Sequence, residues 1–129
     1  MVGIVLVSHS EKIVEGIREL AMQMAPDAKV AIAGGTTDGR IGTSIDKISE
    51  AISSVYSEDG VLVLFDLGSA YMNTEMSIEF LDDEMRENVQ IVDTAIVEGG
   101  ISAIVEASMD KTLGEIKESV EIMKLNKMP

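Results

Sequence analysis

The chain has 129 residues, the size of a single domain, and its formal net charge of −13 argues against nucleic acid or an anionic membrane surface as a partner. It contains no cysteine, which excludes disulfides, thiolate metal ligands and a cysteine nucleophile. No apolar run approaches the roughly 20 residues that a membrane crossing needs, so we expect residues 1–129 to form one cytoplasmic domain.

Four short apolar segments, rich in β-branched residues, are typical of strands that are buried on both faces. They are residues 2–7, 30–33, 61–65 and 89–92. Helix-length segments separate them, and parallel strands need crossover connections of that kind. The sequence therefore predicts an α/β fold, with an open, mainly parallel sheet of four or five strands and helices on both faces. Right-handed crossovers favour the strand order 2-1-3-4.

Between these strands, apolar residues spaced three and four apart predict helices with one buried face. The predicted faces are Ile13, Ile17, Leu20, Ala21 and Met24 in the first helix, Ile45, Ile48, Ile52 and Val55 in the second, and Met72, Met76 and Phe80 in the third. We interpret the acidic run at residues 82–84 as a solvated helix end.

The last part of the chain predicts two more helices. Ile101, Ile104 and Val105 indicate one, and TLGE at residues 112–115 is a capping-box pattern ahead of a final helix that we expect to end near residue 125. Residues 126–129 are then expected to fray.

The only histidine, His9, follows the first strand, and Asp66 follows the third. In an open parallel sheet, reacting groups gather beyond the carboxyl ends of the strands, where the strand order reverses. The order 2-1-3-4 makes the first and third strands neighbours, so we expect His9 and Asp66 side by side. A neutral imidazole is a nucleophile, and a carboxylate on its other nitrogen would fix the tautomer and stabilise the positive ring formed on modification.

Helix capping offers alternative interpretations of the same segments. Residues 8–11 fit a capping box with Ser8 as the N-cap, which would place His9 in the first helical turn, and Ser10 is the other candidate cap. There His9 would face the positive end of the helix dipole, which favours a bound anion. His9 could equally be a loop residue and Asp66 a helix cap. Residues 34–44 could be turns followed by a capped helix start.

Four motifs occur in the order and spacing of a known family. They are VSHS at residues 7–10, GGTTDGRIGTS at residues 34–44, VLFDLGSA at residues 63–70 with Asn73 and Glu75, and VEG at residues 97–99. Together they resemble the DhaM-type phosphotransfer subunit of the phosphoenolpyruvate-dependent dihydroxyacetone kinase, a family similar to the EIIA domain of mannose-type phosphotransferase systems. The resemblance covers nearly the whole chain.

The resemblance implies a phosphohistidine relay. His9 would take a phosphoryl group from the phosphocarrier protein HPr and pass it to ADP on a separate dihydroxyacetone kinase subunit, while Asp66 would orient His9. Gly68 and Ser69 would open the third helix beside the phosphoryl group. Backbone N–H groups at helix starts and hydroxyls such as Ser10 and Ser69 would bind its oxygens.

Further expectations follow for binding and assembly. The partners would dock around His9, on the loop of residues 34–43, which includes Gly35, Asp38 and Thr43, and at the start of the third helix. We expect a covalent phosphoryl group on His9 and neither a permanently bound cofactor nor a metal; no GxxxxGK[ST] nucleotide loop is present. The donor would be a separate protein. The family resemblance and the apolar content of 46% predict a homodimer.

Other functions are consistent with parts of the same pattern. The EIIA domain of a mannose-type sugar permease would share the fold and His9 but would hand the phosphoryl group to a permease subunit. A non-catalytic, flavodoxin-like module would bind a small anion in the crevice without covalent transfer. A receiver domain phosphorylated on aspartate is disfavoured, because the first strand does not end in an acidic pair that could hold Mg²⁺.

Overall fold

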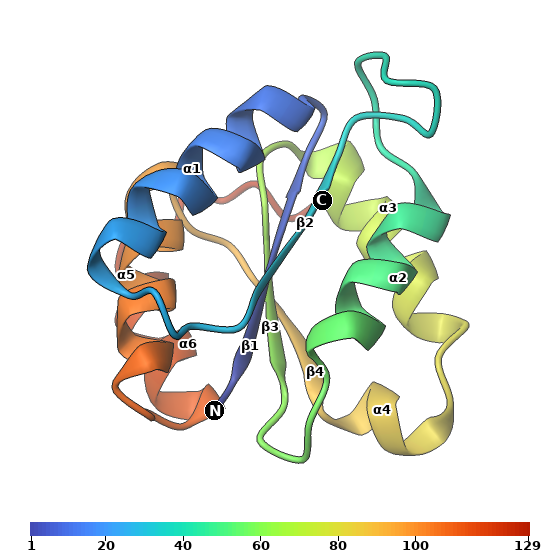
Figure 1. The fold of residues 1–129 in the computed structure, drawn as a ribbon. Coiled ribbons are helices and arrows are strands. Elements are labelled where there is room, and N and C mark those ends of the chain that lie inside the picture. Colours follow the sequence, from blue (N-terminus) through green and yellow to red (C-terminus); the bar gives the residue numbers. More distant parts are fainter.

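The computed structural model describes residues 1–129 and contains one four-stranded, all-parallel sheet of order β2-β1-β3-β4 (Figure 1). The strands are β1 (Gly3–Ser8), β2 (Val30–Gly34), β3 (Val61–Phe65) and β4 (Val89–Val92). The predicted fold class and strand order are confirmed, and the sheet has four strands.

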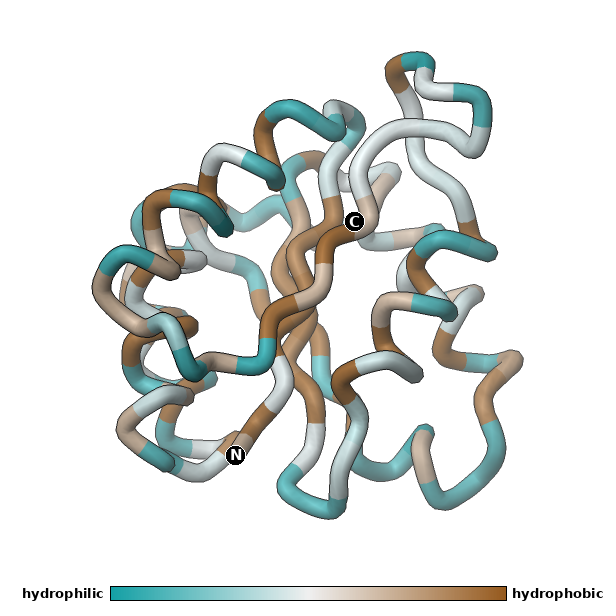
Figure 2. Tube along the Cα trace, viewed as in Figure 1, coloured by the Kyte–Doolittle hydropathy of each residue, from teal (hydrophilic) through white to brown (hydrophobic).

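Helices cover both faces of this sheet (Figure 1). On one face lie α1 (Glu11–Met24), α5 (Ile96–Ser108) and α6 (Leu113–Glu121). On the other lie α2 (Ile45–Val55), α3 (Gly68–Glu79) and the short α4 (Asp83–Glu87). The two central strands, β1 and β3, are buried along their whole length because a core packs against each face, and they form the apolar centre in Figure 2. None of the helices combines the length and apolar character that a membrane crossing requires.

The strand register brings several loops together at the carboxyl edge of the sheet. Val7 pairs with Phe65, so the residues after β1 and β3 leave the sheet from neighbouring points. At the end of β2, a Cβ on Gly34 would lie 2.6 Å from the Cα of Glu11. Glycine is therefore required where β2 ends against the start of α1, and this close approach brings the loop after β2 beside the end of β1.

The predicted face of the first helix is confirmed at Ile17 and Ala21 but wrong at its other positions, and that of the third helix is wrong. In α1, Ile13, Leu20 and Met24 are exposed, and the buried residues are Val14, Ile17 and Ala21. In α3, Met72, Met76 and Phe80 are exposed, and the buried residues are Ala70, Thr74 and Ser77. The hydroxyls of Thr74 and Ser77 donate to carbonyls within α3, at 2.8 Å in each case. Small residues with satisfied hydroxyls can therefore form the packed face of α3, and the larger apolar side chains face outward.

The structure also refines the predictions for the acidic run at residues 82–84 and for the C-terminal end of the chain. The run at residues 82–84 is exposed and forms the N-terminal end of α4, where the Asp82 carboxylate caps the helix by accepting from the Met85 N–H at 2.9 Å. The last helix ends at Glu121, earlier than expected. Residues 126–129 were expected to fray, but the Asp93 carboxylate accepts the N–H of Lys127 and holds this segment against the sheet edge.

The capping box at the start of α6 is confirmed, since Thr112 and Glu115 each accept the other's backbone N–H. We predict that Thr112→Ala lowers the free energy of unfolding by about 1 kcal/mol, because one helix-start N–H loses its acceptor. Urea denaturation measures this loss. Glu115→Gln retains a side-chain oxygen for the Thr112 N–H and should cost less; an equal or larger loss in that variant would contradict this account.

Candidate active site

The segment between β1 and α1 presents His9 ahead of the helix. Ser10 is the N-cap residue of α1 but makes no side-chain cap, and the helix begins at Glu11. Ser8 ends β1, and its hydroxyl accepts the N–H of Ser10 at 3.0 Å while donating to Asp66 at 2.9 Å. The capping box built on Ser8 is therefore not formed, and His9 lies before the first turn of α1.

The Asp66 carboxylate is the centre of the hydrogen-bond network at this edge. Its Oδ1 accepts from the His9 ring at 3.0 Å and from the N–H of Leu67 at 2.7 Å, and its Oδ2 accepts from the N–H of His9 at 3.0 Å and from Ser8. Burial opposes ionisation of this side chain, which is only 13% exposed. The donors from His9, Ser8 and Leu67 outweigh that effect and lower the pKa of Asp66 below its usual value.

The two ring nitrogens of His9 have different partners. Nδ1 lies 3.0 Å from Asp66 Oδ1, and Nε2 lies 2.7 Å from the hydroxyl oxygen of Ser69 at the start of α3. A carboxylate accepts only, so Nδ1 carries the proton; in the neutral ring Nε2 then has a lone pair that can accept from Ser69. The side chain of His9 is 21% exposed. When the ring is neutral, this arrangement therefore presents the lone pair of Nε2 at the surface.

The helices that begin beside His9 have no side-chain caps. Neither Ser10, before α1, nor Leu67, before α3, accepts a hydrogen bond from its helix, whereas side chains cap α2, α4 and α6. Gly68 and Ser69 are the first two residues of α3. Uncapped helix starts present free N–H groups and the positive end of a dipole, the features that bind phosphate oxygens.

The loop of residues 34–43 is fixed against the same site. The N–H of Gly42 donates to the carbonyl of His9 at 2.9 Å, and the N–H of Gly35 donates to the carbonyl of Ser8 at 3.1 Å. Gly35 has a φ of 72°, a conformation that glycine adopts readily. Thr43 accepts a hydrogen bond from Asn73 and so connects the loop to α3.

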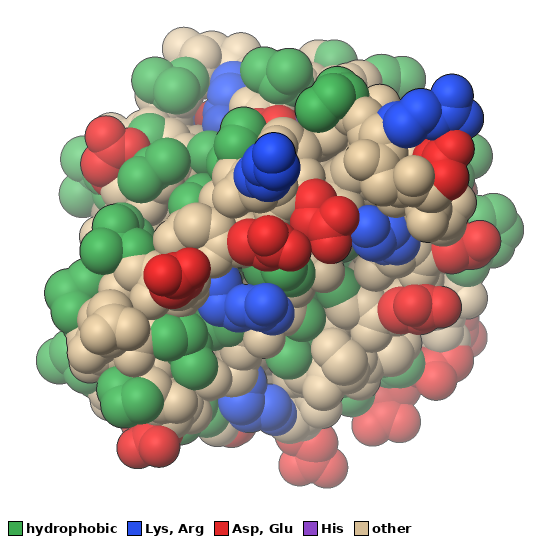
Figure 3. All heavy atoms as spheres, turned by 45° about the horizontal axis from the view of Figure 1, so that its top comes forward, with side chains coloured by type: hydrophobic (Ala, Val, Ile, Leu, Met, Phe, Trp, Pro, Cys, Tyr) green, Lys and Arg blue, Asp and Glu red, His purple; other side chains and the backbone are tan.

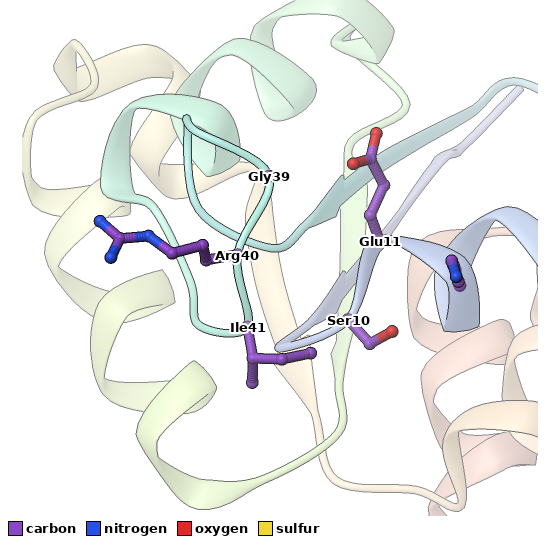
Figure 4. Close-up of a pocket in the computed structure, with 6 residues that line it drawn as sticks. Ser10, Glu11, Gly39, Arg40 and Ile41 are labelled. Atoms are coloured by element: carbon purple, nitrogen blue, oxygen red, sulfur yellow. The ribbon is translucent and has the colours of Figure 1, made fainter.

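The tip of this loop borders a hollow beside His9. Asp38 and Arg40 form an exposed ion pair of 2.7 Å at the tip, which projects from the molecule in Figure 1. The hollow has a volume of about 670 Å³ and is lined by Ser10, Glu11, Lys12, Gly39, Arg40 and Ile41. Figure 4 shows the start of α1 facing the loop across it, with Arg40 pointing away. In Figure 3, which turns this end forward, charged and hydrophobic side chains are mixed over the surface.

Sequence reasoning therefore located most of the side chains that meet here but not all of their partners. Asp66 and Ser69 each contact the His9 ring directly, while the Ser10 side chain lines the hollow and makes no hydrogen bond to His9. The hydroxyl of Ser8 was missed as a partner of Asp66. Lys47 was missed too; its ammonium donates to the carbonyl of Gly34 at 2.7 Å and anchors the base of the loop. Neither contact has a sequence signal, because each joins segments that only the fold brings together.

Comparison with known proteins identifies the family. The EIIA-man family, described as the PTS system fructose IIA component, matches residues 3–117. The chain belongs to this family. Its most similar relatives include a phosphoryl donor subunit, DhaM, of a PEP-dependent dihydroxyacetone kinase from Listeria innocua, which is 39% identical over 83% of this chain and 86% of its own length. The DhaM-type resemblance seen in the motifs is confirmed.

Two further relatives carry similar descriptions. The phosphotransferase subunit DhaM of a PTS-dependent dihydroxyacetone kinase from Lactococcus lactis is 36% identical over 97% of this chain and 98% of its own length. The DhaM of Escherichia coli is 40% identical over 94% of this chain, but the match covers only 27% of that longer protein. Relatives of this kind therefore occur both at about the length of this chain and as parts of longer proteins.

Solved structures agree with the fold. A crystal structure of a protein of unknown function has a TM-score of 0.84 and 31% identity, covering 94% of this chain and 93% of its own. The dihydroxyacetone kinase from C. freundii, solved with AMP-PNP and Mg²⁺, has a TM-score of 0.63 and 15% identity over 97% of this chain and 25% of its own. The second similarity shows the fold alone.

Because the pKa of Asp66 is lowered in the folded protein, the free energy of unfolding should depend on pH through this group. A carboxylate whose pKa is lower when folded stabilises the fold above its unfolded pKa of about 3.9, and the contribution is lost as the pH falls through the folded pKa. We predict that Asp66→Asn lowers the free energy of unfolding by about 1–3 kcal/mol at pH 7, because the amide cannot accept from all four donors. The deficit should shrink as the pH falls below about 4.

Urea denaturation of the wild type and the variant across this pH range measures the effect. Asp27→Asn provides the control, since Asp27 is exposed and lies before β2, far from the site in the sequence. A deficit in Asp66→Asn that does not vary with pH would contradict the assignment of an ionised Asp66.

Proposed function

We propose that this protein is the phosphoryl donor subunit of a phosphoenolpyruvate-dependent dihydroxyacetone kinase, that residues 1–129 act as one phosphotransfer domain, and that His9 carries the phosphoryl group. The observation that carries the proposal is the polarised imidazole, with Nδ1 against Asp66 and Nε2 toward Ser69 at the surface. The descriptions of the DhaM relatives support the same role.

The geometry accounts for each part of the transfer. The lone pair of Nε2 attacks phosphorus as the bond from phosphorus to the donor's nitrogen breaks, and the donor keeps that electron pair. The ring then holds both the Nε2–P bond and the Nδ1 proton, so it is positively charged, and the Asp66 carboxylate stabilises it at 3.0 Å. Ser69 loses its acceptor on Nε2 and is placed to donate to a phosphoryl oxygen, together with N–H groups at the starts of α1 and α3.

The proposed partners are HPr as the donor and ADP on a dihydroxyacetone kinase subunit as the acceptor, both in the cytoplasm. Two proteins would dock in turn over His9. In the second step a β-phosphate oxygen of ADP bonds to phosphorus as the Nε2–P bond breaks, and Nε2 keeps the electron pair of that bond. The loop with Gly35, Asp38 and Thr43, together with the hollow beside Ser10, forms the surface next to His9 that such partners would contact. We propose no other cofactor than the covalent phosphoryl group.

Phosphorylation of His9 can be tested with purified components. After incubation with phosphoenolpyruvate, Enzyme I and HPr, we expect mass spectrometry to show one acid-labile phosphoryl group on the wild type and none on His9→Ala. Asp66→Asn should fold but accept the group about 10- to 100-fold more slowly, because the ring loses the carboxylate that orients it and balances its charge. Asp27→Asn should react at the wild-type rate.

The same experiment separates the alternatives. Addition of the ADP-loaded kinase subunit should discharge the phosphorylated protein and form ATP, whereas an EIIA domain of a mannose-type permease would discharge only to its permease subunit. An anion-binding module would gain no phosphoryl group at all. Retained phosphorylation in His9→Ala would disprove the assignment of His9.

We also propose that the protein is a homodimer. Exposed apolar side chains on α1, namely Ile13, Leu20 and Met24, offer apolar surface that a second subunit could bury. Static light scattering at micromolar concentration should give twice the chain mass of 13.8 kDa. A mass equal to that of one chain across this range would contradict the dimer.

A further inference from the structure

The residues after α6 return across the carboxyl edge of the sheet and are held there by the loop after β4. The Asp93 carboxylate, in a residue that is 7% exposed, accepts the N–H of Leu125 at 3.2 Å and the N–H of Lys127 at 2.6 Å. The N–H of Ala95 donates to the carbonyl of Met123 at 3.1 Å. Residues 123–127, called here the C-terminal brace, are therefore fixed beside the site and not free in solvent.

The brace places the ammonium of Lys127 at the end of β3. Lys127 Nζ donates to the carbonyl of Phe65 at 2.9 Å and to that of Thr94 at 2.8 Å, and it lies 4.9 Å from the centre of the Phe65 ring. Strand alternation turns the Phe65 carbonyl toward β4, but β4 ends at Val92, which pairs with Leu64. The lysine ammonium therefore takes the place of the backbone N–H that a longer β4 would donate to this carbonyl.

This contact acts on the peptide group that leads into Asp66. The Phe65 carbonyl and the Asp66 N–H belong to the same planar peptide, and the Asp66 N–H donates to the carbonyl of Val7 at 3.1 Å. Lys127 thus holds one side of the peptide while β1 holds the other. The carbonyl of Lys127 also lies against the start of α3, since a Cβ on Gly68 would be 3.2 Å from it.

We propose that Lys127 is a positioning residue of the phosphoryl-transfer site, which holds the Phe65–Asp66 peptide so that the Asp66 carboxylate aligns the His9 ring. The inference rests on the proposed function, because it assumes that His9 carries the phosphoryl group. Burial lowers the pKa of Lys127, while the nearby carboxylates of Asp93 and Asp66 oppose that shift and favour the charged ammonium. An ammonium at this place is thus a double donor, to the carbonyls of Phe65 and Thr94.

The test compares three substitutions in the full chain. Lys127→Met removes the donor and the charge at similar length, Lys127→Arg keeps both, and Lys124→Met removes a nearby exposed lysine whose side chain makes no hydrogen bond or ion pair. We expect Lys127→Met to lower the maximal rate of phosphorylation by HPr about tenfold with little change in the KM for phosphorylated HPr. Lys127→Arg should recover most of the rate, and Lys124→Met should match the wild type.

A second measurement does not depend on phosphorylation. The Nδ1 proton shared with Asp66 should give a downfield resonance in the ¹H–¹⁵N NMR spectrum of the wild type, and this resonance should weaken through faster exchange in Lys127→Met. Wild-type transfer rates and an unchanged resonance in a folded Lys127→Met would overturn the inference.

Should Lys127→Met fail to fold, Lys127→Gln, which keeps a neutral donor, takes its place and must show an intermediate rate. If the wild type itself is not phosphorylated while the resonance responds to Lys127→Met, the proposed function fails and the positioning contact stands.

Discussion

The carboxylate of Asp66 is the interaction on which the site depends. It accepts hydrogen bonds from Ser8, from the backbone and ring of His9 and from Leu67, and thereby joins the ends of β1 and β3. One ionised group thus fixes the backbone path after β1, the tautomer of the imidazole and the turn into α3. The burial that this requires is costly for a charge, and four donors compensate for it.

The parallel sheet makes such a concentration of contacts possible. Both central strands are buried along their whole length. Polar side chains that must reach solvent are therefore found after the last residue of each strand. Because Val7 and Phe65 lie in register, the next residues along both strands emerge at the same height. The loop after β2 then covers one side through the Gly42 N–H, and the C-terminal brace supports the other through Lys127. The sheet therefore lies below the site, and Nε2 of His9 faces outward.

Side chains cap the starts of three helices but not those of α1 and α3, which face the site; the start of α5, at Ala95, also has no side-chain cap. Ser44, Asp82 and Thr112 close the starts of α2, α4 and α6 with side-chain oxygens. The starts of α1 and α3 have no such oxygen, although Ser10 stands at the N-cap position of α1. The serine beside His9 that could have capped a helix, Ser8, bonds to Asp66 instead. The N–H groups left open therefore lie where a phosphoryl group on His9 would need donors.

The local pattern of the sequence determined the elements and their order. Buried β-branched runs at regular spacing define parallel strands, right-handed crossovers define their order, and the Thr112 capping box needs only residues of its own turn. The proximity of His9 and Asp66 followed from that strand order alone.

Tertiary structure decided which side of α1 and α3 is buried, since both helices have apolar residues on more than one side. It also decided the roles of Ser8, Lys47 and Lys127, because each contacts a partner on another element, 58 residues away for Ser8 and 62 for Lys127. Hydrogen bonds over such separations have no local signature; they exist only after the strands are in register.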